Sequence, residues 1–200
     1  MSATQAIPSA GFVDPVHDAQ QAFRGALDAL SHPGRAVEIG ECVAGLPLGA
    51  AVAHLLLALT DADTPVWWQA PGDGVTHWLR FHTGAGAVTR PQDAAFAVVA
   101  EPAAMPALET FAAGTLASPE FSTTVLIEVP SLVDGPALQW HGPGIRNTHC
   151  VQLAGLPPGF WTQWQANHAA FPQGVDVIFT CGRRAIGLPR TTRVARLEGI

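Results

Sequence analysis

The sequence predicts an α/β protein whose central sheet is covered on both faces. Segments of helical periodicity alternate along the chain with short runs that are apolar and rich in β-branched residues. Runs without a polar side are typical of strands that are buried on both faces. The chain has 200 residues, no internal repeat and no obvious linker, so one domain over residues 1–200 is the simplest division.

The segment DPVHDAQQAFRGALDALSHPG predicts the first helix, with Asp14 as N-cap and Pro15 at the first helical position. Ser31 and His32 are expected to help end this helix, together with Pro33-Gly34. They are not expected to act as a nucleophile and its base, because side chains of adjacent residues rarely point at each other. Six apolar residues fall on one face at the spacing of a core-facing helix: Val16, Ala19, Phe23, Ala26, Leu27 and Leu30.

The other elements are expected in the following order. RAVEIG predicts a short strand, residues 49–59 a buried helix, TPVWWQA and AAFAVVA buried strands, and MPALETFAAG a short helix. STTVLIEVP is the clearest strand, because it is β-branched and ends at Pro130. ALQWHGPGI predicts another strand, GFWTQWQANHAAF a helix, and GVDVIFTC and AIGLP two final strands.

Missing residue types exclude several enzyme classes. The chain has no lysine, so it lacks both the phosphate-binding lysine of a P-loop and the lysine that holds pyridoxal phosphate (PLP). It has no tyrosine, and the motifs GxSxG, HExxH and GxGxxG are absent. PLP is therefore excluded, and we expect no cofactor.

Charge, cysteines and apolar segments restrict the compartment and the partners. The net charge of −6 argues against a nucleic-acid partner. Cys42, Cys150 and Cys181 are odd in number and form no CxxC, so no disulfide framework or structural zinc is expected, and a reducing, cytoplasmic location fits. The start has no signal-peptide pattern, and the apolar run 49–59 reaches only about 16 Å as a helix, so no membrane span is expected.

The end of the chain is rich in arginine. Five of the ten arginines lie in the last 18 residues, where Glu198 is the only acid: Arg183, Arg184, Arg190, Arg193 and Arg196. This pattern suggests an anionic ligand or an acidic protein surface as partner, and the alternative is a solvated face with internal salt bridges. In LPRTTR, Arg190 and Arg193 fit an anion pocket or a subunit contact, and we favour the contact slightly.

The segment LQWHGPGIRNT, residues 138–148, holds the main candidate for a binding site. A predicted strand ends at His141, and Gly142 and Gly144 allow a tight turn or a close approach of the backbone. Free main-chain amides in the turn and the guanidinium of Arg146 would suit a phosphate oxygen. The alternative is a plain turn whose arginine meets solvent or a carboxylate.

Histidines and tryptophans indicate less about function. His77 and His82 are five residues apart and His141 and His149 eight, so neither pair has the i, i+4 spacing of a helical metal site, and we expect no metal. The tryptophans are core residues or, at an exposed edge, suit an obligate interface. They are Trp67, Trp68, Trp78, Trp140, Trp161 and Trp164.

Several separated motifs follow one another along the chain. They are FRGALDALSHPGR, TGAGA, GTLASPEFSTTVLIEV, LQWHGPGI with LAGLPPGFW, and FPQGVDVIFT with LPRTTRV. In number and order, this set closely resembles the PhnH subunit family of the bacterial carbon–phosphorus (C–P) lyase system. The resemblance extends from about Asp14 to Val194.

The resemblance implies a fold, partners and a process. Proteins of this family are similar to the large domain of PLP-dependent transferases but hold no PLP, so the expected fold is a three-layer α/β/α sandwich with a mixed, mainly parallel sheet. They form homodimers alone and assemble with PhnG, PhnI, PhnJ and PhnL. Together these subunits install a phosphonate at the ribose carbon of a nucleoside triphosphate and displace the base. No catalytic residue is carried over from the family.

Two functions of different class remain open. In the first, the chain is a non-catalytic or co-catalytic subunit of the phosphonate-processing complex. In the second, it is an autonomous enzyme that binds a phosphorylated substrate through Arg146, Arg190 and a histidine. A phosphonate or a nucleotide is the expected ligand class in either case.

Overall fold

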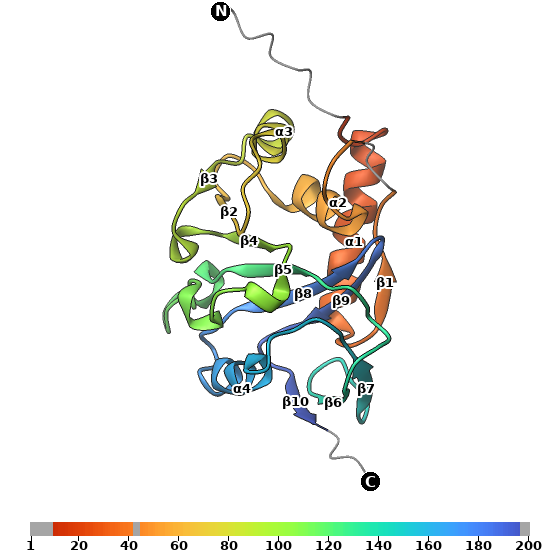
Figure 1. Cartoon of the computed structure of the whole chain (residues 1–200), viewed down its shortest axis with the longest axis vertical. Helices are drawn as coiled ribbons and strands as arrows, with labels where there is room; N and C mark the ends of the chain where they lie inside the picture. The colour runs from red at the N-terminus through yellow and green to blue at the C-terminus, as the bar shows by residue number, and fades with distance from the viewer. Residues whose placement is uncertain (1–9, 42–44, 197–200) are drawn as a thin grey trace, which may run out of the picture.

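The computed structural model describes residues 10–41 and 45–196 and arranges them in three layers (Figure 1). The helices α1 (Pro15–Ser31), α2 (Ala50–Leu59) and α3 (Asp73–Thr83) cover one face of a seven-stranded sheet. On the other face lie α4 (Phe160–Ala169) and a three-stranded sheet. This last layer is therefore part helix and part sheet, where the resemblance led us to expect helices.

The main sheet is mixed and mostly parallel, as predicted. Its strands in spatial order are β1 (Ala36–Glu38), β9 (Arg184–Leu188), β8 (Asp176–Cys181), β5 (Thr124–Glu128), β4 (Phe96–Val99), β2 (Val66–Trp68) and β3 (Ala87–Val88). The five strands from β8 to β3 are parallel to their neighbours. In contrast, β9 is antiparallel to both β8 and β1. The edge strands of the sheet are β1 and β3.

Apolar side chains on both faces of the sheet explain the lack of polar alternation in its strands. In β5, Val125 and Ile127 pack toward α4, whereas Leu126 packs toward α1, α2 and α3. All three are fully buried. Successive strand residues point to opposite faces, so a sheet covered on both sides needs apolar residues at every position. The prediction of a sheet covered on both faces is confirmed.

The smaller sheet contains two strands that the sequence analysis did not predict. Its central strand β6 (Ala137–His141) pairs antiparallel with β7 (His149–Gln152) and with β10 (Arg193–Arg196). Each of these outer strands buries a single residue, Val151 or Val194. Their apolar signal is therefore too weak to be recognised, and AIGLP is not the last strand.

Two further segments differ from expectation. MPALETFAAG is not an α-helix but contains the 3₁₀ turn η3 (Leu108–Thr110), and the turn η2 (Pro102–Ala104) precedes it. The helix α3, which the sequence analysis missed, has the glycines Gly72 and Gly74 around its start.

The N-terminus of α1 has the predicted cap. Oδ1 of Asp14 accepts hydrogen bonds from the main-chain N–H groups of Val16 and His17, at 3.2 and 3.1 Å. Pro15 is the first helical residue, and His32 takes the C-cap position after Ser31. The cap satisfies donors that the first helical turn leaves without a partner.

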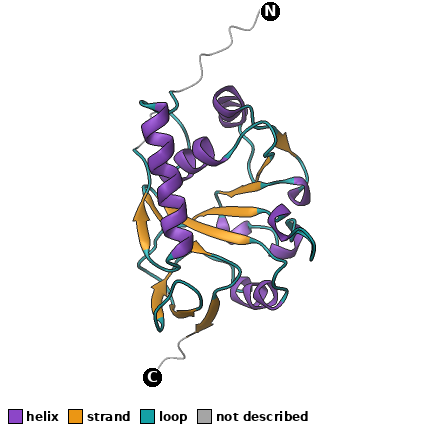
Figure 2. Cartoon of the chain, turned by 180° about the vertical axis from the view of Figure 1, so that it is seen from behind, coloured by secondary structure: helices purple, strands orange, loops and turns teal. Residues whose placement is uncertain are grey.

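The buried face of α1 agrees only in part with the predicted one, because Ala26 is buried and Ala19 and Leu30 are partly buried, but the other three predicted residues are exposed. The helix buries the small residues Ala22, Ala26 and Ala29, whereas Val16, Phe23 and Leu27 are 82%, 47% and 52% exposed. The reason is the short distance to β9, which α1 crosses (Figure 2). A Cβ atom on Gly187 would lie 2.4 Å from the main-chain oxygen of Ala29, so only small side chains fit between helix and sheet.

The tryptophans belong to the core, not to an exposed edge. Five of the six are buried and Trp67 is partly buried. The large exposed aromatic residues are phenylalanines instead: Phe23, Phe81, Phe121 and Phe171. An interface that depends on aromatic side chains would therefore use phenylalanine.

Neither a bilayer-spanning helix nor a disulfide occurs in the described part of the chain. No helix there is both long enough and apolar enough to cross a membrane. Cys150 and Cys181 are free thiols, and Cys42 lies outside the described residues.

A partly buried carboxyl group supports the start of α2. Glu128, at the carboxyl end of β5, accepts a hydrogen bond of 2.6 Å from the main-chain N–H of Gly49, the N-cap of α2. Burial raises the pKa of Glu128, and this hydrogen bond lowers it by less. The sequence analysis gave no indication of this contact, because the two residues belong to distant segments.

We expect the stability to fall as the pH rises through the raised pKa of Glu128. When the pH is above the ordinary pKa of glutamate, Glu128 is still protonated in a larger fraction of folded than of unfolded chains. Each further rise in pH therefore favours unfolding, until Glu128 is ionised in both states. Urea unfolding between about pH 4 and pH 7 should show a smaller fall for Glu128→Gln than for the wild type. The exposed Glu109→Gln is the control, and an unchanged pH dependence in Glu128→Gln would contradict the assignment.

Candidate functional site

The turn between β6 and β7 depends on its two glycines. The strand β6 ends at His141 and β7 begins at His149, and the turn contains one main-chain hydrogen bond, from Ile145 to Gly142, of 3.1 Å. Gly142 has φ +154° and Gly144 has φ +80°. Side chains other than that of glycine are strained at these angles, so the predicted tight turn is confirmed.

This turn packs against the turn that joins α1 to β1. A Cβ atom on Gly144 would lie 2.1 Å from the main-chain oxygen of Ser31. In the opposite direction, a Cβ atom on Gly34 would lie 2.8 Å from Cδ2 of His149 and 2.9 Å from Cγ2 of Val151. Each turn therefore uses a glycine to admit the other, and we call residues 31–35 and 142–149 the paired turns.

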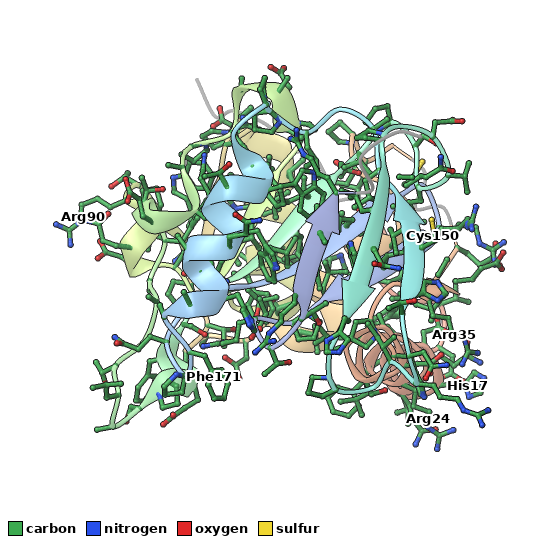
Figure 3. The ribbon with its side chains drawn as sticks, turned by 90° about the horizontal axis from the view of Figure 1, so that it is seen from below. His17, Arg24, Arg35, Arg90, Cys150 and Phe171 are labelled. Atoms are coloured by element: carbon green, nitrogen blue, oxygen red, sulfur yellow. The ribbon has the colours of Figure 1, made fainter. Side chains whose placement is uncertain are left out.

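A cavity of about 290 Å³ lies between the paired turns. Its lining includes His32 and Arg35 from the first turn and Arg146, Asn147, Thr148 and His149 from the second. No described residue that lines it carries a carboxylate. In Figure 3, Arg35 lies on the same side of the molecule as Cys150, the residue after His149, with Arg24 and His17 of α1 beside it.

A single carboxylate lies next to this cationic group. Oδ1 of Asp28 is 2.9 Å from Nδ1 of His32, and its Oδ2 is 3.8 Å from Nη2 of Arg35. Arg146 forms no ion pair with any described residue. The carboxylate of Asp28 is therefore shared by His32 and Arg35, Arg146 has no acidic partner among the described residues, and the cavity keeps an excess of positive charge.

Main-chain donors add to the side chains. The amide groups of Arg146, Asn147 and Thr148 donate to no carbonyl or side chain of the described residues. These groups lie on the turn that lines the cavity. Consecutive free amides next to a guanidinium are the donor set that anions bind in turns.

Ser31 and His32 are closer than predicted but do not form a catalytic pair. Oγ of Ser31 lies 3.1 Å from Nδ1 of His32, the same nitrogen that faces Asp28. In a serine triad, the carboxylate and the serine contact opposite nitrogens of the imidazole, so that one orients the ring while the other gives up its proton. The arrangement at His32 lacks this geometry, and its role as helix C-cap stands.

The other candidate site residues lie apart from the cavity. His141 and Arg193 face each other in the pairing of β6 with β10. Nε of Arg193 donates to Nε2 of His168 at 3.2 Å, and the other ring nitrogen of His168 lies 2.8 Å from the carbonyl oxygen of Arg190. Of the predicted residues, only Gly144 and Arg146 line the cavity, and Gly142 shapes its turn.

Arg190 has a structural environment. Its side chain is 12% exposed and forms an ion pair with Asp176. Its remaining guanidinium donors contact the carbonyl oxygens of Pro119 and Pro172, each at 3.2 Å, and the hydroxyl of Ser122. All five N–H donors thus have protein acceptors, so this arginine offers none to an anion. A role in a subunit contact stays a prediction.

The remaining C-terminal arginines do not converge on one ligand. Arg183 bridges Glu38 and Glu41, at 3.5 and 3.1 Å, and Arg196 reaches the carbonyl oxygen of Pro158 at 3.5 Å. The internal salt bridges that we kept as an alternative therefore account for Arg183 and Arg190. Within the described residues, no three histidine, cysteine or acidic side chains gather as a metal site would require.

Comparisons with known proteins agree on one family. A family model described as "Bacterial phosphonate metabolism protein (PhnH)" matches residues 10–195. "Alpha-D-ribose 1-methylphosphonate 5-triphosphate synthase subunit PhnH" of Rhizobium meliloti (strain 1021) is 39% identical over 199 residues, which are 98% of this chain and all of that protein. "Putative C-P lyase subunit protein HtxG" of Stutzerimonas stutzeri is 34% identical over 176 residues, 88% of this chain and 85% of its own length.

Replacing Gly144 by alanine should separate the paired turns. The new Cβ would meet the oxygen of Ser31 at 2.1 Å, and the positive φ would be strained. We expect a loss of about 2 kcal/mol or more in the free energy of unfolding, measured in urea. Gly86→Ala is the matched control, because a Cβ there meets no atom within 4 Å. Equal stability of the two variants would show that the turns tolerate separation.

Replacing Arg190 by methionine should destabilise the fold. Asp176 would keep its charge in a half-buried position without a partner, and we expect a loss of about 3 kcal/mol by thermal or urea unfolding. Arg90→Met is the control, because the Arg90–Asp93 pair, at 2.7 Å, is exposed and solvent screens it, so little change is expected. A fully stable Arg190→Met variant would refute the structural role.

Proposed function

The chain belongs to the PhnH family of bacterial phosphonate metabolism proteins, and from this premise we propose that it is a subunit of a cytoplasmic C–P lyase system. In this role it is needed, with partner subunits, to form a ribose 1-phosphonate triphosphate from a nucleoside triphosphate and a phosphonate. Its contribution is to assemble the complex or to complete a shared site.

The observation that carries the proposal is the alignment with the Rhizobium meliloti protein. It leaves no part of that relative unmatched and covers 98% of this chain at 39% identity. A gain or loss of a domain would have changed this coverage. The relative is named as a synthase subunit, and the Stutzerimonas stutzeri relative as a C-P lyase subunit, so both names describe a part of a larger assembly.

We propose PhnG, PhnI, PhnJ and PhnL as the partner subunits and a homodimer for the chain alone. The outer face of α1 suits a protein contact, because Val16, Phe23 and Leu27 lie at helical spacing and are largely exposed. The close packing of α1 on β9 leaves these large side chains outside. This face is the partner contact that we propose to test.

The autonomous enzyme is the weaker alternative. It relied on Arg146, Arg190 and a histidine to bind a phosphorylated substrate, and the guanidinium donors of Arg190 all contact protein atoms, which leaves Arg146 as the one available arginine of this set. Ser31, His32 and Asp28 meet around one ring nitrogen and do not form a relay. A subunit role needs neither arrangement.

We propose further that the scaffold is that of a PLP-dependent transferase domain that works without PLP. The mostly parallel sheet between two covering layers supports the likeness. The absence of lysine supports the loss of the cofactor, because no internal aldimine can form. Tightly bound PLP in the purified protein would contradict this proposal.

Co-purification tests the subunit role. We expect the tagged chain to co-elute with PhnG, PhnI, PhnJ and PhnL when all are expressed together, and to show no turnover of a nucleoside triphosphate and methylphosphonate when it is alone. The double variant Phe23→Ser, Leu27→Ser should lose co-elution, because it replaces the apolar face of α1 with hydroxyl groups.

The control for this test is Phe81→Ser, which replaces an exposed aromatic residue on α3. It should co-elute like the wild type. Turnover by the lone chain, or a wild-type chain that elutes apart from the other subunits, would refute the subunit role. Retained co-elution of the double variant would refute only the assignment of the contact to α1.

A further inference from the structure

We propose that the cavity between the paired turns binds a tetrahedral phospho group, either a phosphate or the phosphonate equivalent. The inference goes beyond the proposed function, which assigns no ligand to any residues of this chain. The common chemistry is a compact dianion with three terminal oxygens. It is found in a free phosphonate and in the terminal γ-phosphoryl group of a nucleoside triphosphate.

The charge of the cavity favours an anion. Arg35 and Arg146 come from different turns and line the same space of about 290 Å³. Their only carboxylate neighbour among the described residues is Asp28, at 3.8 Å from Nη2 of Arg35. Guanidinium groups bind phospho groups through paired, parallel hydrogen bonds, which makes arginine well suited to this ligand. This chain has no lysine that could take their place.

The hydrogen-bond donors of the cavity match the oxygens of a phospho group. Amide groups of residues 146–148 are without protein acceptors within the described residues. The side chains of Asn147 and Thr148 add an amide and a hydroxyl to the lining. Three terminal oxygens accept several hydrogen bonds each, so they can satisfy main-chain and side-chain donors together.

The glycine contacts hold the two arginines in place before any ligand arrives. Gly144 lies against Ser31, and Gly34 lies against His149, so the turns cannot move independently. A site that is formed in advance loses less conformational entropy on binding. The main-chain positions of Arg35 and Arg146 relative to each other are therefore set by backbone packing and not by the ligand.

A second cavity gives room for a larger phosphorylated molecule. It has a volume of about 510 Å³, and its lining includes the two arginines Arg35 and Arg24 together with the two carboxylates Asp28 and Glu38. Arg35 thus borders both spaces. A phospho group held between the turns could carry a substituent that extends toward Arg24.

Other cavities are poor candidates for an anion. A cavity of about 510 Å³ near His54 is lined by Asp18, Glu38 and Glu41 with Arg183 as its one arginine. Two of these carboxylates already bind that arginine. A fourth cavity, of about 360 Å³ between η3 and α4, is mainly apolar, and its described lining contains Glu109 and no arginine.

Calorimetry with inorganic phosphate at low salt tests the site on the purified full-length chain. We expect saturable binding at one site per chain, and about tenfold weaker binding in either Arg35→Gln or Arg146→Gln. Arg24→Gln is the matched control: it removes the same charge from the same side of the molecule but lies outside the cavity between the turns. Its phosphate affinity should equal that of the wild type.

Methylphosphonate and ATP, titrated in parallel, identify the source of the phospho group. If ATP binds more tightly than phosphate and Arg24→Gln weakens only ATP, the site takes a nucleotide. If methylphosphonate binds as phosphate does and Arg24→Gln has no effect on it, the site takes a free phosphonate. In either case, Arg35→Gln and Arg146→Gln must each weaken the binding of that ligand.

Two results would overturn the inference. One is the lack of saturable binding of all three ligands to the wild type. The other is equal weakening of phosphate binding by Arg24→Gln and by the two cavity variants, which would reflect the general field of the surface. Because co-elution of the wild-type chain with the other subunits is measured separately, a failed anion site leaves the subunit role standing.

Discussion

The close approach of two turns is the constraint on which the proposed site depends. Gly34 and Gly144 each lie so near the opposite turn that a Cβ atom would collide with it. The turn after α1 and the turn after β6 therefore form one unit, although they are far apart in the sequence. This unit places Arg35 and Arg146 around one cavity and directs free amide groups into the same region. The arginines supply the positive charge and the main-chain amides supply hydrogen-bond donors, and the two glycines bring the turns that carry them together.

Small residues also determine which side chains α1 exposes on the surface of the protein. Alanines of α1 and Gly187 of β9 bring helix and sheet together, so the bulky side chains of α1 remain outside. Apolar residues exposed at helical spacing are a feature of helices that contact a partner. The proposed contact surface thus runs along α1 and the proposed site lies at the C-terminal end of the same helix, since α1 leads directly into the first paired turn. A subunit built in this way can join its partners through α1 and hold an anion near the end of that helix.

Local signals in the sequence predicted local structure well. The Asp14 cap, the apolar strand β5 and the glycine turn at Gly142 and Gly144 follow from neighbouring residues alone. Contacts between distant segments could not be predicted in this way. No sequence pattern marked Arg35 as a residue of a binding site. Nor did any pattern indicate that the guanidinium donors of Arg190 all contact protein acceptors. The buried face of α1 depends on its close contact with Gly187 in β9. The strands β7 and β10 were missed because each buries one residue.

The central claim is that the paired turns form an anion site on a protein that otherwise acts by assembly. The most direct measurement is a methylphosphonate titration of the isotope-labelled chain, followed residue by residue through its amide NMR signals. The account predicts saturable shifts concentrated at Gly34, Gly144 and residues 146–148, with little change at Arg183 and Arg184. Shifts concentrated near Arg183 and Arg184, or none at the paired turns, would contradict it.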